Sequence, residues 1–513
     1  MTTAPLSGRH RRTVGLAIRF GLELWWVQKT RPFRGAERQQ AVQRALYTRQ
    51  ARQFRDFALG MGGLIIKLGQ FLSVRIDFLP KPYIDELGAL QDAVPPVDSA
   101  TAVRVVEREL GRPVGELFAT FDRAPLAAAS LGQVHRATLR TGEAVAVKIQ
   151  RPGIDGLIET DLKSLRAIVR LLGRFTKVGR FVDLAEFSRD FETTFRDELD
   201  YELEGRNAEA FQRNFLMSRF VETPRIHWSC STRRVLTMEF MDGVKINDLA
   251  ALDRLGVDRA AVARHLLDIY LQMFLQDGFY HADPHPGNIF VRPDGVVQLI
   301  DFGMVARIPE AQRRLYTELI VGLVRQNPDS VVAALQGLGF LLPDADAEGF
   351  KKNLLPLLET LTNELGTLFQ GPSMLEDMMQ GTTPLGLDAQ GLDGLREFIL
   401  TQPIGLPGNT TFLGKAFITV VSNCFKLDPA IDVVGIAKPY VTVEAGLWFV
   451  RDWLVGLVDG GLGVVRDLRP LAQPLIDWAQ GFDFEGLARD LNQAALAAAL
   501  ILGVVSEEGH HGY

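Results

Sequence analysis

The stretch HADPHPGN, residues 281–288, concentrates polar side chains of the kinds that bind metal ions or act on phosphate groups. Asp283 and Asn288 are separated by four residues, and Asp301 of the tripeptide DFG follows thirteen residues after Asn288. In kinase loops with this H-x-D-x-x-x-x-N spacing, the aspartate orients the phosphoryl acceptor, and the asparagine and the DFG aspartate bind Mg²⁺. The pattern predicts a phosphotransferase in which Asp283 is catalytic and Asn288 and Asp301 are metal ligands.

A metal cluster of His281, Asp283 and His285 is the alternative interpretation, because alternating residues of a strand share one face. Pro284 and Pro286 flank His285, however, and disrupt a regular strand. The cluster would also leave DFG without a role. The phosphotransferase interpretation is therefore favoured.

A phosphotransferase of this kind needs a lysine that holds the phosphates from an upstream strand. The segment AVAVK ends in Lys148 and matches the V-A-I-K pattern of kinases. Further upstream, AAASLGQV stands where a glycine-rich loop is expected, and two of the usual glycines are alanines. Because alanine resists positive φ and limits close backbone approach, we expect a stiffer loop that binds nucleotide differently. Its candidate nucleotide-binding residues are Ala127, Ala129, Ser130, Gly132 and Val134.

Lys148 also needs an acidic partner. RDELDYELEGRN (196–207) lies on a predicted helix, where Glu198 and Glu202 share one face and Asp200 and Glu204 another. Charge runs of this kind are commonly solvated faces, so most of these carboxylates need have no role.

The substrate side of the site is marked by two further features. MEFMDG (238–243) has the form of a hinge between lobes, with the backbone near Glu239 and Met241 placed to pair with adenine. After DFG the sequence becomes helical almost at once, with no A-P-E. Little room remains for the activation segment on which peptide substrates dock.

The chain of 513 residues is long enough for two or three domains. Residues 36–92 are predicted to be helical, VHRATL and AVAVKIQ to form a β-hairpin around RTGE (140–143), and 183–216 to form a helix. Strands are expected at 233–241 and on both sides of PDG (293–295), and helices at 258–278 and beyond Asp301. This order predicts an α+β fold with two lobes. The expected parts are a basic amphipathic segment (1–35), a helical extension (36–100), a small lobe (101–243), the catalytic part of the large lobe (244–330) and a helical C-terminal region (331–513).

Composition narrows the functional classes. Apolar residues make up 47% and charged residues 23%, which is typical of a globular protein. Cys230 and Cys424 lie far apart, so neither a disulfide framework nor a cysteine zinc site is expected, and a reducing compartment is the default. The net charge of −6 argues against a general nucleic-acid binder.

The charge is unevenly spread. Residues 1–60 hold 12 Lys/Arg and 3 Asp/Glu, a balance of +9, which leaves −15 for the remainder. VGLAIRFGLELWWVQ (14–28) within this segment is either an interfacial helix, with Trp25 and Trp26 at a headgroup boundary, or an ordinary packed helix. Arg19 and Glu23 make a signal peptide a poor fit. Because 442–458 is interrupted by charges and 492–505 is short, we expect no transmembrane helix, although 492–505 has the composition to dip into a bilayer.

Taken in order, the motifs resemble the UbiB/AarF family of atypical protein-kinase-like ATPases, which is linked to ubiquinone and other isoprenoid-quinone biosynthesis. HADPHPGN alone is less specific, since it also resembles small-molecule kinases of the aminoglycoside and choline type. The resemblance covers residues 36–310. Its markers are KLGQ (67–70), AAAS (127–130), AVAVK (144–148), ELD (198–200), HADPHPGN (281–288) and DFG (301–303).

The resemblance implies a bilobal protein-kinase-like fold whose K-x-G-Q helix packs over the active site and blocks the peptide groove. From the residues alone, GGLIIKLGQFLSVR favours a core helix whose lysine reaches out to solvent. The resemblance instead places Lys67, Gly69 and Gln70 near the nucleotide as regulatory residues, together with Asp200.

The resemblance also sets the order of acidic partners for Lys148, with Glu204 first and Glu198 second. It implies ATP or ADP and Mg²⁺ as cofactors, and a membrane surface, a prenyl lipid or lipid-biosynthetic enzymes as partners. A cytoplasmic location at the inner face of a membrane follows. Three functions stay open, namely an ATPase or small-molecule kinase, a protein kinase acting in trans, and a nucleotide-gated scaffold.

Overall fold

The structure is a computed structural model that describes residues 6–33, 35–73, 80–88, 90, 96–175, 184–324, 327–341, 348–351, 408–433, 435–437 and 439–440. The chain divides into two compact units, Met1–Ala445 and Gly446–Tyr513. The second unit, the segments 442–458 and 492–505, and most of the region 331–513 lie outside the described residues. Within the described ranges, no helix combines the length and apolar character needed to cross a bilayer.

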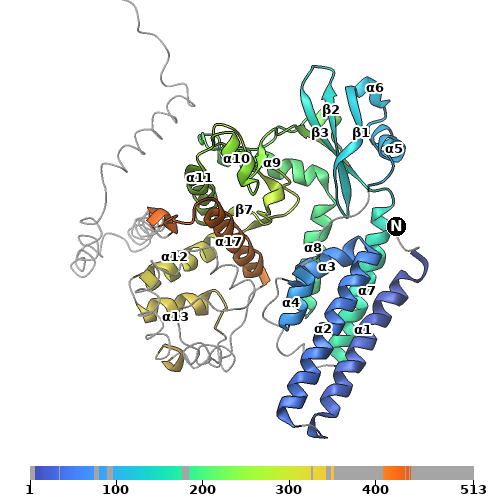
Figure 1. The fold of residues 1–513 in the computed structure, drawn as a ribbon, viewed down its shortest axis with the longest axis vertical. Coiled ribbons are helices and arrows are strands. Elements are labelled where there is room, and N and C mark those ends of the chain that lie inside the picture. The colour runs from blue at the N-terminus through green and yellow to red at the C-terminus, as the bar shows by residue number, and fades with distance from the viewer. Residues whose placement is uncertain are drawn as a thin grey trace, which may run out of the picture. The chain divides into compact units, whose positions relative to one another are not determined.

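Three long helices lie side by side in the N-terminal part, namely α1 (Leu6–Lys29), α2 (Ala36–Met61) and α7 (Ile154–Phe175) (Figure 1). A fully buried ion pair between Arg9 and Asp161 fixes α1 to α7. Two glycines with positive φ, Gly62 and Gly63, then end α2 and allow α3 (Leu64–Ser73) to begin in a new direction, followed by α4 (Lys81–Gly88). The helical prediction for 36–92 is confirmed in its described parts.

The small lobe is a four-stranded antiparallel sheet in the order β1-β2-β3-β5. Its strands are β1 (Phe118–Ala128), β2 (Gly132–Leu139), β3 (Ala144–Gln150) and β5 (Val235–Glu239). The predicted hairpin is confirmed, with Val134 opposite Lys148. Helices α5 (Ser99–Leu110) and α6 (Val114–Leu117) join its core. Strand β1 was not expected, because its exposed and bulged course lacks the alternation of apolar residues that predicts a strand.

The helix predicted over 183–216 is in fact two helices, α8 (Leu184–Glu198) and α9 (Tyr201–Asn214). The break has a local cause, because the carboxylate of Asp200 accepts hydrogen bonds from the N–H groups of Glu202 and Leu203 and caps α9. The helical-face argument that paired Glu198 with Glu202, and Asp200 with Glu204, is therefore wrong.

The large lobe holds short strands on a helical base. The strands β4 (Val221–Glu222), β6 (Val244–Lys245), β8 (Ile289–Val291) and β9 (Val297–Leu299) form one sheet, and β7 (Phe279–His281) pairs with β10 (Val305–Arg307). Its helices are α10 (Leu249–Arg254), α11 (Arg259–Leu271), the π-helical continuation Gln272–Asp277, α12 (Glu310–Val324), α13 (Pro328–Gly337) and α17 (Gly408–Leu427).

Two features of this lobe bear on the site. Helix was expected almost at once after DFG, and α12 does begin at Glu310, but the short strand β10 comes first and pairs with β7. Helix α17 packs against α11 although about 140 residues separate them (Figure 1). It therefore returns a distant segment of the chain to the base of the catalytic loop.

Candidate active site

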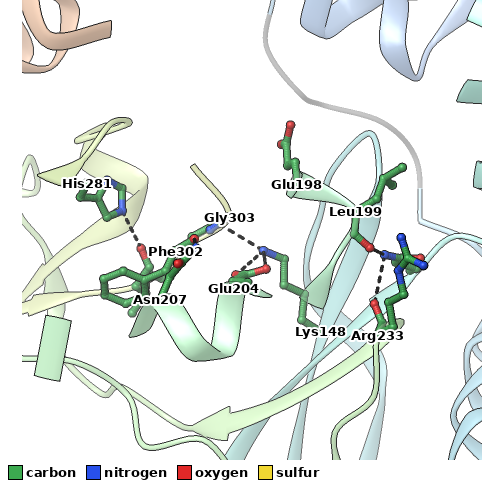
Figure 2. A network of polar contacts seen from close by, with 12 residues as sticks. Lys148, Glu198, Leu199, Glu204, Asn207, Arg233, His281, Phe302 and Gly303 are labelled. Atoms are coloured by element: carbon green, nitrogen blue, oxygen red, sulfur yellow. Dashed lines mark hydrogen bonds and ion pairs between the residues drawn. The ribbon is translucent and has the colours of Figure 1, made fainter. Parts of the chain in front are cut away.

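The centre of the site is the amine of Lys148 on β3. Its Nζ lies 2.7 and 2.9 Å from the two carboxylate oxygens of Glu204 on α9, and 3.2 Å from Oδ1 of Asp301. Figure 2 shows the Lys148 amine next to the carboxylate of Glu204, with Glu198 apart from it. The structure thus brings the lysine, the first-choice acidic partner and the DFG aspartate together, and it leaves Glu198 away from the amine.

Electrostatics in this cluster follow from burial and proximity. Burial disfavours the charged amine, but Asp301 and Glu204 outweigh it and raise the pKa of Lys148 well above its usual range. Burial raises the pKa of Glu204 to about 7 in spite of Lys148. Burial also tends to raise the pKa of Asp301, but the positive charge of Lys148 outweighs burial and lowers this pKa to about 2. Asp301 is therefore the firmly ionised carboxylate of the cluster, and 45% of its side chain remains exposed to a ligand.

The catalytic loop is held by its own polar groups. The N–H of Asp283 donates to Nδ1 of His281, whose Nε2–H donates to the carbonyl of Ile300. The side chain of Asn288 donates from Nδ2 to the carbonyl of Asp283 over 3.1 Å. These bonds fix the loop against the β8–β9 hairpin and leave one-third of the Asp283 side chain exposed.

These contacts also test the alternative of a histidine metal cluster. Both ring nitrogens of His281 are engaged, and Nδ1 of His285 accepts from the N–H of Gly287 in its own turn. Among the described residues, no three His, Cys, Asp or Glu side chains are grouped to hold a metal ion. The described geometry therefore gives no support to the cluster.

The predicted Mg²⁺ ligands lie at one end of the β8–β9 hairpin. The N–H of Ile300 donates to the carbonyl of Asn288, so Asp301 directly follows the residue that faces Asn288. Since the Asn288 amide nitrogen is engaged, its oxygen remains for a cation. Asp301 has a φ of 63°, an unusual value outside glycine that often accompanies function. One carboxylate and one amide oxygen suit Mg²⁺ held jointly with phosphate oxygens.

The alanine-rich loop is the tight turn of the β1–β2 hairpin. Ala127 pairs with Val134, and the N–H of Ala129 donates to the carbonyl of Gly132. A Cβ on Gly132 would lie 2.5 Å from the hydroxyl of Tyr201 and 2.6 Å from the Ile149 carbonyl, so this position requires glycine.

Two polar atoms in this region are buried without a described partner. These are the hydroxyls of Ser130 in the turn and of Tyr201, whose ring lies 5.2 Å from the Lys148 amine. A polar group that is buried without a hydrogen bond is costly, so both hydroxyls are free to bind the oxygen atoms of a ligand.

The K-x-G-Q helix α3 reaches the site through Lys67. Its Nζ lies 2.6 Å from Oε1 of Glu198, which is the contact that Glu198 makes in place of one with Lys148. Leu64 and Leu68 of α3 pack in one apolar cluster with Leu131 of the alanine-rich turn. The sequence alone favoured a core helix whose lysine reaches out to solvent. The leucines of α3 are indeed in a core, but Lys67 contacts Glu198.

Two other candidate regulatory residues, Gly69 and Asp200, have contacts that serve packing and helix capping. A Cβ on Gly69 would lie 2.3 Å from Leu90 and 3.3 Å from the ring of Phe54, so glycine permits the close packing of α3. Gln70 lies in α3, and its side chain is outside the description. Asp200 caps α9 and lies 3.6 Å from Arg233, which gives it a structural role.

Comparison with known proteins identifies the family. A family profile described as "ABC1 atypical kinase-like domain" matches residues 89–335. The Arabidopsis thaliana protein named "ACTIVITY OF BC1 COMPLEX KINASE 8, chloroplastic" is 37% identical over 446 residues, covering 83% of this chain and 58% of that protein. The Synechocystis sp. protein sll1770, described as uncharacterized, is 34% identical over 427 residues, covering 83% of this chain and 70% of that protein. The chain belongs to the ABC1 (UbiB) family of atypical kinase-like proteins.

The fold agrees with this membership. The structure of the Rv3197–erythromycin complex from Mycobacterium tuberculosis matches with a TM-score of 0.51 and 25% identity, covering 76% of this chain and 95% of that one. The predicted mixed α+β, kinase-like fold with N-terminal helices is thereby confirmed. The five-part division of the chain stays a prediction.

The hinge of this ABC1 protein is only partly available to a nucleotide. The N–H of Glu239 donates to the carbonyl of Arg225, and the N–H of Phe240 donates to the carbonyl of Ala144. The side chains of Glu239 and Met241 border a hollow of about 440 Å³ that the Lys148 cluster does not line. Adenine pairing at Glu239 and Met241 stays a prediction, and at Glu239 it would have to use the carbonyl.

The sequence analysis missed one neighbour of Asp283, namely Lys415 of α17. Its Nζ lies 3.0 Å from Oδ1 of Asp283. Burial tends to raise the pKa of Asp283, but the charge of Lys415 outweighs it and lowers the pKa below its usual value. The only signal in the sequence was a lysine within the apolar run FLGKAFITVV (412–421), a pattern that many ordinary helices share.

Proposed function

We propose that this chain is an atypical kinase or ATPase that binds Mg·ATP and serves isoprenoid-quinone or other prenyl-lipid biosynthesis at a membrane surface. The observation that carries the proposal is the contact of one partly buried lysine, Lys148, with both Glu204 and the DFG aspartate Asp301. In kinases, the lysine–glutamate pair and the DFG aspartate must both be in place for phosphoryl transfer. Support for the quinone role comes from membership of the UbiB family. The names of the relatives do not mention quinones.

The residues divide the chemistry as follows. Lys148 holds phosphate oxygens, and the hydroxyl of Ser130 offers them a donor from the alanine-rich turn. Asn288 and Asp301 would hold Mg²⁺, which when bound offsets the negative charge of the phosphates. Asp283 orients the acceptor hydroxyl and takes its proton as the acceptor oxygen bonds to the γ-phosphorus and the bond from that phosphorus to ADP breaks.

The acceptor is proposed to be water or a small hydroxyl compound rather than a peptide. The contact of Lys67 with Glu198 brings α3 to the site, and the chain after DFG runs through β10 into α12 with few intervening residues. Both features leave little platform for a peptide. A protein kinase acting in trans and a nucleotide-gated scaffold are the competing functions.

A membrane surface is the proposed partner of α1. Ile18, Leu22, Trp25 and Trp26 recur at helical spacing and are exposed by 47, 61, 56 and 60%. Arg11 and Lys29 fall on the same face at either end of this stripe, because the intervals of seven, four, three and four residues are those of one helical face. Aromatic residues flanked by basic ones suit an anionic bilayer interface, where each basic residue adds about 1 kcal/mol. An inner, cytoplasmic membrane face is the proposed location.

The catalytic part is tested by ATP hydrolysis with purified protein, Mg²⁺ and anionic liposomes. The variant Lys148→Met should lose turnover, while Lys163→Met, which removes an exposed lysine of α7, should keep it. ATP binding without turnover in the wild-type protein would refute the ATPase and favour the scaffold. Phosphate transfer to a defined protein, lost in Asp283→Asn, would favour the protein kinase.

The membrane part is tested by co-sedimentation with liposomes. The double variant Trp25→Ser/Trp26→Ser should bind anionic liposomes at least tenfold more weakly, and Leu216→Ser, at a position 72% exposed on another segment, should bind normally. Equal binding of all three proteins would show that α1 does not face the bilayer.

A further inference from the structure

We propose that Lys415 of α17 is a catalytic residue that contacts the transferring phosphoryl group beside Asp283. This inference rests on the proposed phosphoryl transfer. It assigns a role in the reaction to a helix that lies 132 residues beyond the catalytic aspartate.

The placement of Lys415 is fixed by the packing of α17. The side-chain amide of Asn423 donates to the carbonyl of Pro284, the residue next to Asp283, in a buried hydrogen bond of 3.2 Å. Val420 and Val421 of the same helix are fully buried in the core of the large lobe. Because α17 binds the catalytic loop directly, the Lys415 amine is held at this carboxylate by a rigid element.

The Lys415–Asp283 pair is also partly exposed. The two side chains keep 32 and 34% of their surface exposed, whereas Arg9 and Asp161, a structural pair, keep none. A lysine whose purpose is only to attach α17 would gain little from a partly solvated pair, since such pairs contribute less than about 1 kcal/mol. The exposure instead leaves the amine within reach of a ligand that enters at Asp283.

The other cations around the site have different partners. Lys148 contacts Glu204 and Asp301, and Lys67 contacts Glu198. His285 lies two residues after Asp283, and its Nδ1 accepts a hydrogen bond from the N–H of Gly287 in its own turn. The charges of Lys67 and His281 also act on Asp283, and Lys415 makes a 3.0 Å contact with this carboxylate, which receives the acceptor proton in the proposed reaction.

The chemistry of the step calls for a cation at this point. As the acceptor oxygen bonds to the γ-phosphorus, its proton passes to Asp283 and the bond to ADP breaks, so charge on the phosphoryl oxygens must be offset close to Asp283. An ammonium group has three donors and can contact Asp283 and a phosphoryl oxygen at once. Removing one positioned donor from a developing oxyanion costs about 10²–10³ in kcat.

The first test compares Lys415→Met, Lys415→Arg and Lys426→Met in steady-state ATP hydrolysis. Lys426 is an exposed lysine of the same helix and serves as the matched control. We expect kcat to fall about 10²–10³-fold in Lys415→Met with KM for ATP unchanged, partial retention in Lys415→Arg, and no change in Lys426→Met. Added alkylammonium ions should restore part of the activity of Lys415→Met and should not change the activity of Lys426→Met.

The second test is a binding measurement. Titration calorimetry should show that Lys415→Met binds Mg·ADP as the wild-type protein does but loses at least tenfold in affinity for Mg·ADP with aluminium fluoride, which mimics the transferring phosphoryl group. A Lys415→Met protein with wild-type kcat, or with equal losses for ADP alone and for the mimic, would overturn the inference. A wild-type protein without turnover would overturn the proposed function first, and this inference with it.

Discussion

The buried ion pair between Arg9 and Asp161 offers a quantitative test of how α1 is attached. Both side chains are fully buried, and the Nε–Oδ1 and NH2–Oδ2 distances are each 2.6 Å. Arg9 also donates to the carbonyls of Met61 and Gly62, at the turn from which α3 starts. The pair therefore joins α1, α7 and the base of the helix that carries Lys67.

The expected cost of breaking the pair follows from its burial. Arg9→Met or Asp161→Leu leaves one charge buried without its partner, which costs about 3–5 kcal/mol. The double variant removes both charges and should cost little more than the larger single change, so the coupling energy should reach at least about 2 kcal/mol. The exposed pair Arg112–Glu116 serves as control, and Arg112→Met should cost less than about 0.5 kcal/mol.

Hydrogen exchange of the α1 amides is the assay, because it reports local opening without assuming that the whole chain unfolds in one step. Faster exchange in both single variants, with a double variant little worse than the more damaging of the two, would agree with the structure. Additive effects, or single variants within about 1 kcal/mol of wild type, would refute the burial argument.

Two further predictions concern the nucleotide site itself. Gly132→Ala should weaken ATP binding at least tenfold, because its Cβ would meet the Tyr201 hydroxyl and the Ile149 backbone, whereas Gly115→Ala on α6, with open space around it, should leave binding intact. The stability of the wild-type protein relative to Glu204→Gln should fall as the pH rises from about 5 to 8, because the folded state holds the Glu204 proton up to a pKa of about 7 and the unfolded state releases it near 4.5. Thermal denaturation across this pH range measures the difference, and a constant or rising difference would contradict the argument.

The central residues of the site could be predicted because local structure fixes their spacing. Asn288 and Asp301 sit on one hairpin, and Lys148 lies on a strand whose apolar alternation is evident in the sequence. Once the strands pair, their register determines which side chains meet. The motifs therefore named Lys148 and Asp301, whereas Glu204 was singled out among four carboxylates only by the family resemblance.

Contacts between residues far apart in the chain were not predictable from the sequence. Lys415 meets Asp283 only because α17 docks on α11, and its surroundings in the sequence are those of any amphipathic helix. The separation of Glu198 from Glu204 depended on a single cap at Asp200 within a stretch of strong helix formers. Strand β1 formed through pairing with β2 in spite of the helix-prone alanines at its end.

The claim that this cluster is an Mg·nucleotide site is tested most directly by calorimetric titration of a non-hydrolysable ATP analogue, with Mg²⁺ or with EDTA. Wild-type protein and Asp294→Asn, which changes an exposed carboxylate of the same hairpin, should bind at least tenfold more tightly with Mg²⁺ than with EDTA. Asp301→Asn should lose this dependence on Mg²⁺. Equal binding by all three proteins, or wild-type binding that does not respond to Mg²⁺, would contradict the assignment of Asp301 and the site built around it.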